Sequence, residues 1–162
     1  MLEQGHTRIG FIKGIDSHGA TGLRLAGFER ACREYGVTID GELIVPGHFD
    51  FESGRLAARH LFDQAKPPSA IIASNDDMAA GVLFEARERN ISVPEDVSVV
   101  GFDDTPLAQR IWPPLTTVRQ PIHQMVRSAV DRLIKTVGGV SIDDGPTRFS
   151  CDVVVRQSTQ GR

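Results

Sequence analysis

The chain has 162 residues, of which 40% are hydrophobic and 24% charged, and its formal net charge is -3 with a pI near 5.9. These values are ordinary for a soluble globular domain, and they exclude a disordered or collagen-like chain. The acidic balance also argues against a chain that itself grips a nucleic-acid backbone, because that task needs a clustered basic face.

The sequence predicts a cytoplasmic protein with no membrane partner. Its longest uncharged apolar stretches are strand-sized, such as residues 71–73, and the polar start at residues 1–6 is unlike a signal peptide. The two cysteines, Cys32 and Cys151, have no CxxC or Cys/His spacing, so we interpret them as small free thiols. We therefore expect no disulfide, no metal and no cofactor.

Strand-like and helix-like segments alternate through the first two thirds of the chain. The apolar run at residues 8–13 predicts a buried strand that ends at Gly14, and apolar positions three and four residues apart predict a helix at residues 21–35. The same unit repeats, with strands predicted at residues 43–45, 70–73 and 97–102 and helices predicted at residues 51–64 and 75–89. This alternation predicts an α/β fold, with a parallel sheet covered by helices on both faces.

The pattern changes after Pro113-Pro114. A short strand is predicted at residues 115–119, followed by a helix whose apolar stripe runs from Ile122 to Val137 and ends at Gly138-Gly139. A loop rich in Asp, Gly and Pro then leads to a final strand at residues 148–155 and a polar tail.

Three polar clusters follow predicted strands: Ser17-His18, residues 74–77 and residues 103–105. In parallel sheets, ligands bind beyond the carboxyl ends of the strands, so these clusters predict a site at that edge.

The acidic pairs Asp76/Asp77 and Asp103/Asp104 raise an enzyme alternative, a Mg²⁺-dependent phosphotransferase. Asp76 and Asp77 lie at a predicted helix start, however, where acidic side chains cap free amides and favour the helix dipole. The five histidines lack metal-ligand spacing, and the sequence contains no GxSxG, GxGxxG or P-loop motif. These patterns favour a binding protein, with no catalytic residues and no metal.

A recognition site for a neutral polyhydroxylated ligand needs paired hydrogen-bonding groups and an aromatic face. Arg24, Phe49, Asn75 and Asp103 supply a guanidinium, a ring, an amide and a carboxylate, and each lies in or after a loop at the predicted edge. Each residue alone has a structural explanation, as a surface ion pair, core filling, a helix cap and a turn former respectively. Their shared edge favours the binding site.

Six segments together resemble the LacI/GalR family of bacterial transcription regulators. They are residues 5–12 (GHTRIGFI), 24–28 (RLAGF), 74–81 (SNDDMAAG), 93–104 (VPEDVSVVGFDD), 114–118 (PLTTV) and 156–159 (RQST). The resemblance covers essentially the whole chain and implies a periplasmic-binding-protein-like type I fold. It further implies a C-terminal effector-binding subdomain at residues 1–114, incomplete at its start. Residues 115–147 would be a crossover strand and helix of the N-terminal subdomain, and residues 148–162 the returning strand and tail.

The resemblance also implies roles for individual residues. Arg24, Phe49, Asn75 and Asp103 match positions that contact a sugar or nucleobase effector, and Ile122 lies near the hinge. The loop with His18 holds larger hydrogen-bonding side chains in purine-binding relatives, so we expect a sugar-like effector.

The implied function is that of a non-enzymatic sensory domain, homodimeric, whose small-molecule effector controls transcription. DNA contact would come only from a helix-turn-helix head, which does not precede Met1 here, and one lobe alone should bind effector weakly. The alternatives are a solute-binding component of a sugar transporter and the phosphotransferase. The sequence does not specify the effector, the operator or the sign of regulation.

Overall fold

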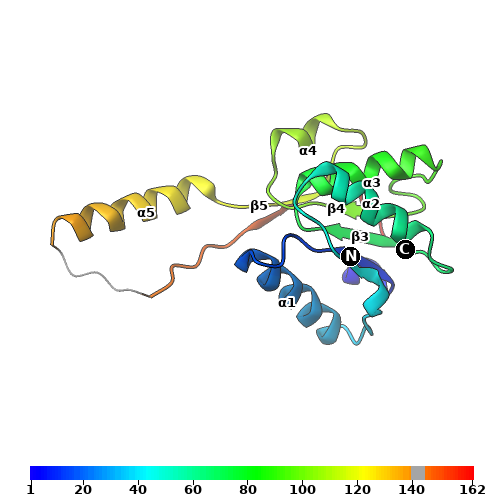
Figure 1. Ribbon diagram of the computed structural model, residues 1–162, viewed down its shortest axis with the longest axis horizontal. Helices are drawn as coiled ribbons and strands as arrows, with labels where there is room; N and C mark the ends of the chain where they lie inside the picture. The colour runs from blue at the N-terminus through cyan, green and yellow to red at the C-terminus, as the bar shows by residue number, and fades with distance from the viewer. Residues whose placement is uncertain (140–144) are drawn as a thin grey trace.

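A computed structural model describes residues 1–139 and 145–162 (Figure 1). Four parallel strands form the main sheet in the order β2-β1-β3-β4. They are β1 (Ile9–Ile12), β2 (Ile44–Val45), β3 (Ala70–Ala73) and β4 (Ser98–Val100). The predicted α/β fold is confirmed. Because β2 lies on one side of β1 and β3 on the other, the sheet has a switch point between β1 and β3, where ligands bind in such folds.

Helices cover the two faces of the sheet unequally. Helix α1 (Gly19–Glu34) lies on one face, and α2 (Phe51–Phe62) and α3 (Asp76–Glu88) lie together on the other (Figure 1). The start of α2 is capped by Asp50, whose Oδ1 accepts a hydrogen bond from the Ser53 amide at 2.7 Å. Most of the core lies between the sheet and the α2–α3 layer, where Ile12, Leu61, Ile71, Met78, Val82 and Val99 are buried.

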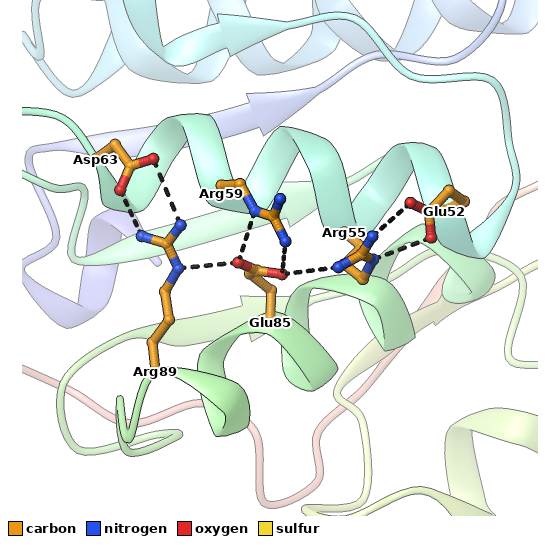
Figure 2. Close-up of polar contacts among 6 residues, drawn as sticks. All are labelled: Glu52, Arg55, Arg59, Asp63, Glu85 and Arg89. Carbon is orange, nitrogen blue, oxygen red and sulfur yellow. Dashed lines mark hydrogen bonds and ion pairs between the residues drawn. The ribbon is translucent and has the colours of Figure 1, made fainter.

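Close backbone contact and ion pairs join α2 to α3. A Cβ at Gly81 would lie 2.2 Å from the Phe51 carbonyl oxygen, so only glycine permits this approach. Alongside, the carboxylate of Glu85 is 3% exposed and lies among the guanidinium groups of Arg55, Arg59 and Arg89 (Figure 2). The two helices therefore form one rigid layer behind the sheet.

Several features differ from the sequence prediction. A short helix, α4 (Pro106–Arg110), follows the Asp103-Asp104 turn and was not predicted, and two 3₁₀ turns occur at Leu2–Gln4 and Gly41–Leu43. Strand β4 is shorter than predicted because the amides of Gly101 and Asp103 donate to the carbonyls of Thr116 and Val118 instead of continuing the ladder with β3. Residues 116–118 thus pair with the chain just after β4, in place of β3.

A two-stranded ribbon extends from this edge. Strand β5 (Thr117–Arg119) pairs antiparallel with β6 (Asp152–Val154), which is shorter than the predicted strand at residues 148–155. Helix α5 (Ile122–Val137) has the predicted bounds and projects away from the rest of the molecule (Figure 1). The loop predicted after Gly139 lies partly outside the described residues. No helix in the described part of the chain combines the length and apolarity needed to cross a membrane.

The division of the chain at residues 114/115 and 147/148 stays a prediction. Leu115 is fully buried in the main core, while α5 has no buried residue. The largest change in packing along this part of the chain therefore comes at the start of α5.

Candidate functional site

Arg24 is the centre of a cluster at the carboxyl edge of the main sheet. It projects from the first turns of α1, and its Nη2 lies 3.7 Å from Oδ1 of Asp103, in the loop after β4. Its Nη1 donates a hydrogen bond to the Ser74 carbonyl at the end of β3. Its Cζ lies 3.9 Å from the ring centroid of Phe102 and 5.8 Å from that of Phe49. One guanidinium thus joins three loops.

Phe49 and Asn75 are joined through their loops. Nδ2 of Asn75 donates to the Phe49 carbonyl at 2.8 Å, and Oδ1 of Asn75 accepts from the Met78 amide at 2.9 Å. Asn75 therefore caps α3, as one interpretation of the sequence predicted, and it also fixes the loop that carries Phe49. The ring of His18 stacks on the ring of Phe49, with centroids 5.6 Å apart.

The backbone at this edge is strained at two of the predicted residues. Phe49 has φ of +64° and Asp103 has φ of +113°, in the region that favours glycine. Such conformations cost about 1–3 kcal/mol each, and they persist where surrounding contacts fix them, commonly at functional sites. Contacts hold both residues here, because Asn75 donates to the Phe49 carbonyl and Gln120 donates to the Asp103 carboxylate.

Gln120 and Phe102 also belong to the cluster, and neither was predicted from the sequence. Nε2 of Gln120 donates to Oδ1 of Asp103 at 2.6 Å, and Phe102 supplies the ring nearest to Arg24. Gln120 directly follows β5, so the rule that selected polar residues after β1 to β4 would have found it if extended by one strand.

Burial shifts the pKa values of Asp103 and Arg24 in opposite directions. Burial raises the pKa of the Asp103 carboxyl, while the Arg24 charge and the Gln120 hydrogen bond lower it. Burial likewise lowers the pKa of Arg24, and the Asp103 charge opposes that shift. A guanidinium stays protonated in proteins, so the pair presents donors and acceptors with little net charge, which suits an uncharged ligand.

An open hollow of about 440 Å³ adjoins the cluster, and its walls include Phe11, Leu23, Arg24, Phe102 and Gln120. Its volume falls within the range of small-molecule sites. Of the predicted residues, only Arg24 is among its lining residues. Ile122 begins α5 with half of its surface exposed, and its backbone amide donates a hydrogen bond to the Gln120 carbonyl at 2.9 Å, which joins it to the cluster through the backbone.

A larger hollow, of about 670 Å³, lies at the free edge of β2, lined by residues that include Ile44, His48, Leu56 and His60. None of the predicted site residues lines it. We favour the smaller hollow because a charged pair and two aromatic rings converge beside it.

Comparison with known proteins identifies the family. Residues 1–159 match the family model described as a periplasmic binding protein-like domain. The chain belongs to this family. It is 38% identical over 160 residues to the transcriptional repressor CytR of Escherichia coli K12, a match that covers 99% of this chain and 47% of CytR. The chain thus spans about half the length of the curated relatives it matches.

Solved structures of periplasmic binding protein-like domains agree with this. A complex of the regulator CelR with cellobiose matches with a TM-score of 0.93 and 34% identity over 97% of this chain and 48% of that one. The repressor AscG of Escherichia coli matches with a TM-score of 0.90 and 34% identity, covering 99% of this chain and 58% of that one. The resemblance to LacI-family regulators is confirmed, and the chain corresponds to their ligand-binding region.

Asp76 and Asp104, one from each acidic pair of this periplasmic binding protein-like domain, have protein partners. Asp76 is fully buried and accepts hydrogen bonds from the Thr105 amide at 2.7 Å and the Thr117 hydroxyl at 2.6 Å. Asp104 pairs with Arg119 and Arg156. Within residues 1–139 and 145–162, no three His, Cys, Asp or Glu side chains are grouped to hold a metal ion. Asp76 and Asp104 therefore act as structural clamps. The named relatives are transcription regulators.

Proposed function

We propose that this chain is the effector-binding half of a bacterial transcription regulator, and that its effector is a small, uncharged, sugar-like molecule. The observation that carries the proposal is the convergence of Arg24, Phe49, Asn75 and Asp103 on one edge of the sheet. Arg24 donates and Asp103 accepts beside two aromatic rings, which is the chemistry that a polyhydroxylated ring requires. The regulator CelR, which has the same fold, forms a complex with the disaccharide cellobiose, and this supports a sugar.

We assign a role to each group. The free N–H groups of Arg24 and the second carboxylate oxygen of Asp103 would bind adjacent hydroxyls, and the ring of Phe49 would cover the C–H face of the ligand. Asn75 would hold the Phe49 loop and offer its remaining donor. His18, stacked on Phe49, and Ile122, at the start of α5, would border the ligand when a second lobe closes over it.

Regulation would proceed by a population shift. Asp103 accepts a hydrogen bond from Gln120, which is followed by Pro121 and α5. A ligand that binds the Asp103 carboxylate would therefore also displace the start of that helix. A closed arrangement favoured by effector would change how DNA-reading segments of the parent protein are held. For the parent protein, we further propose contact with DNA, a homodimeric state and a cytoplasmic location.

The test is calorimetry with a panel of mono- and disaccharides, with nucleosides as the competing ligand class. For the 162-residue chain we expect millimolar affinity for a sugar or none, because half of the enclosing contacts are missing. The complete gene product should bind the same sugar more tightly, and the sugar should change its affinity for operator DNA.

Two variants sharpen that test. Asp103→Asn should abolish sugar binding by the complete gene product, whereas Asp16→Asn, at an ion pair whose Asp16 side chain is 76% exposed, should leave it unchanged. Nucleoside binding in preference to every sugar, or full sugar affinity in Asp103→Asn, would refute the proposed effector class.

A further inference from the structure

Two adjacent aspartates in the loop after β4 are held in different ways. Asp103 accepts a hydrogen bond from Gln120 through Oδ1 at 2.6 Å, and none of its described hydrogen bonds or ion pairs uses Oδ2. The side chain of Asp104 is only 5% exposed, and its two oxygens accept one hydrogen bond each from Arg156 and Arg119. The described contacts therefore leave an oxygen of Asp103 for a ligand, whereas both oxygens of Asp104 are engaged.

The surroundings shift the pKa values of these two carboxyl groups in opposite directions. Burial raises the pKa of Asp103 and outweighs the opposing effect of the Arg24 charge. Burial also acts to raise the pKa of Asp104, but the hydrogen bonds from Arg156 and Arg119 outweigh it and lower that pKa below the ordinary aspartate value. Asp104 is therefore a firmly ionised anchor directly beside a ligand-binding candidate.

Arg156 extends from a segment that is fixed in the core. Its side chain is 14% exposed, its Nη1 donates to the Leu115 carbonyl at 2.7 Å, and its backbone amide donates to Oγ1 of Thr116 at 2.9 Å. Two residues further on, Ser158 is fully buried and its hydroxyl donates to the Val99 carbonyl in β4 at 2.6 Å. The planar guanidinium therefore meets Asp104 from a rigid backbone.

The backbone of the aspartate loop depends on such contacts. Asp103 and Asp104 have φ of +113° and +54°, and residues other than glycine persist in this region only where their surroundings fix them. The amide of Asp104 donates to the Thr117 hydroxyl over 3.4 Å, which is long for a hydrogen bond. The carboxylate of Asp104, with its charged partners, is therefore the stronger restraint on the loop.

We propose that Arg156 is a positioning residue for effector binding, which holds Asp104 and thereby fixes the direction in which the Asp103 carboxylate meets the ligand. Neither Arg156 nor Asp104 lines the hollow beside Arg24, so we assign them no contact with the ligand. Arg156 follows Asp104 by 52 positions in the chain, so the segment after β6 takes part in shaping the site. The inference rests on the proposed function and adds a residue to it.

Hydrogen exchange on the ligand-free 162-residue chain tests the positioning directly. In Arg156→Gln, the amide of Asp103, which donates to the Val118 carbonyl, should lose about tenfold in protection. The amide of Ser69 lies at the opposite end of the strands and reports on unfolding of the whole sheet, so it should change much less. An equal loss at both amides would mean that Arg156 only stabilises the fold, and an unchanged Asp103 amide would mean that it does not hold the loop.

Arg119→Gln is the matched control. Arg119 also donates to Asp104, but its side chain is 52% exposed, so its loss should change the protection of the Asp103 amide far less than the loss of Arg156. Equal effects of the two variants would contradict the special role of the buried arginine.

Calorimetry on the complete gene product, with the mono- or disaccharide that binds best in the panel, tests the link to the ligand. Arg156→Gln and Asp104→Asn should each weaken binding about tenfold, and the double variant no further, because both changes break the same contact. Arg156→Lys, which keeps the charge, should recover part of the loss. Additive losses, or full affinity in Arg156→Gln, would overturn the proposal. If no sugar binds the wild type, the proposed effector class fails, and the exchange experiment still decides whether Arg156 holds the Asp103 loop.

Discussion

A Cβ atom at Gly14 would lie 1.9 Å from Cζ of Phe49, so the loop after β1 must contain glycine for the Phe49 ring to lie where it does. The tip of the Phe49 ring lies against the Gly14 backbone, and the His18 ring stacks on the Phe49 ring. A residue with no side chain therefore positions the aromatic part of the candidate site.

Replacing Gly14 tests this relationship. Gly14→Ala should displace the Phe49 ring, destabilise the fold by about 1–3 kcal/mol through overpacking, and weaken binding of the sugar found by the panel about tenfold. Urea unfolding and calorimetry measure the two effects. Gly22→Ala is the control, because a Cβ there meets nothing within 4 Å and an exposed helical alanine should stabilise α1. Unchanged unfolding and binding in Gly14→Ala would show that the ring position is not constrained.

The sequence predicted the sheet well because its buried strands are uninterrupted apolar runs, and it predicted α5 to the residue because that helix has a clear apolar stripe. Helix α4 was missed since its five residues are too few to show a period. The positive φ of Phe49 could not be predicted, because local sequence rarely places a bulky residue in that region and only tertiary contacts hold it there. Gln120 was missed because the segment before it reaches the site edge through hydrogen bonds from the Gly101 and Asp103 amides to the Thr116 and Val118 carbonyls, which local sequence does not reveal.

Asp76 holds three segments together without a cationic partner of its own in the described structure. Its carboxylate accepts from Thr105, after β4, and from Thr117, in β5. Asp76→Ala should leave these buried donors unsatisfied and lower the free energy of unfolding by about 3 kcal/mol in urea. Asp77→Ala, one residue along on the exposed side of α3, should change it far less. Equal losses in the two variants would contradict the clamp.

Thermal melting with Mg²⁺ tests the phosphotransferase alternative. The oxygens of Asp76 and Asp104 already accept hydrogen bonds or ion pairs, so a divalent ion would have to displace Thr117 or Arg156 to bind. We expect MgCl₂ to leave the melting temperature equal to that in KCl of matched ionic strength. A rise specific to Mg²⁺ that disappears in Asp103→Asn would instead support a metal site.

Glu85 makes the stability of the α2–α3 layer depend on pH. Hydrogen bonds from Arg59 and Arg89 lower the pKa of its carboxyl, against the opposing effect of burial (Figure 2). Glu85→Gln should destabilise the fold by about 3 kcal/mol at neutral pH, because three guanidinium groups lose a buried anionic partner. Glu52→Gln, at the exposed end of the same row, should have little effect.

The pH dependence follows from the direction of that shift. Since the native pKa of Glu85 lies below its unfolded value, its stabilising contribution is complete above the ordinary glutamate pKa and is lost as the pH falls through the native pKa. The difference in unfolding free energy between wild type and Glu85→Gln should therefore be constant near neutrality and shrink toward zero on acidification. Urea unfolding over a pH series measures this difference. Subtracting the unfolding free energy of the variant from that of the wild type removes the contributions of other carboxyls that titrate independently. A difference that persists in strong acid would mean that Glu85 stabilises the layer through its shape and packing instead of its charge.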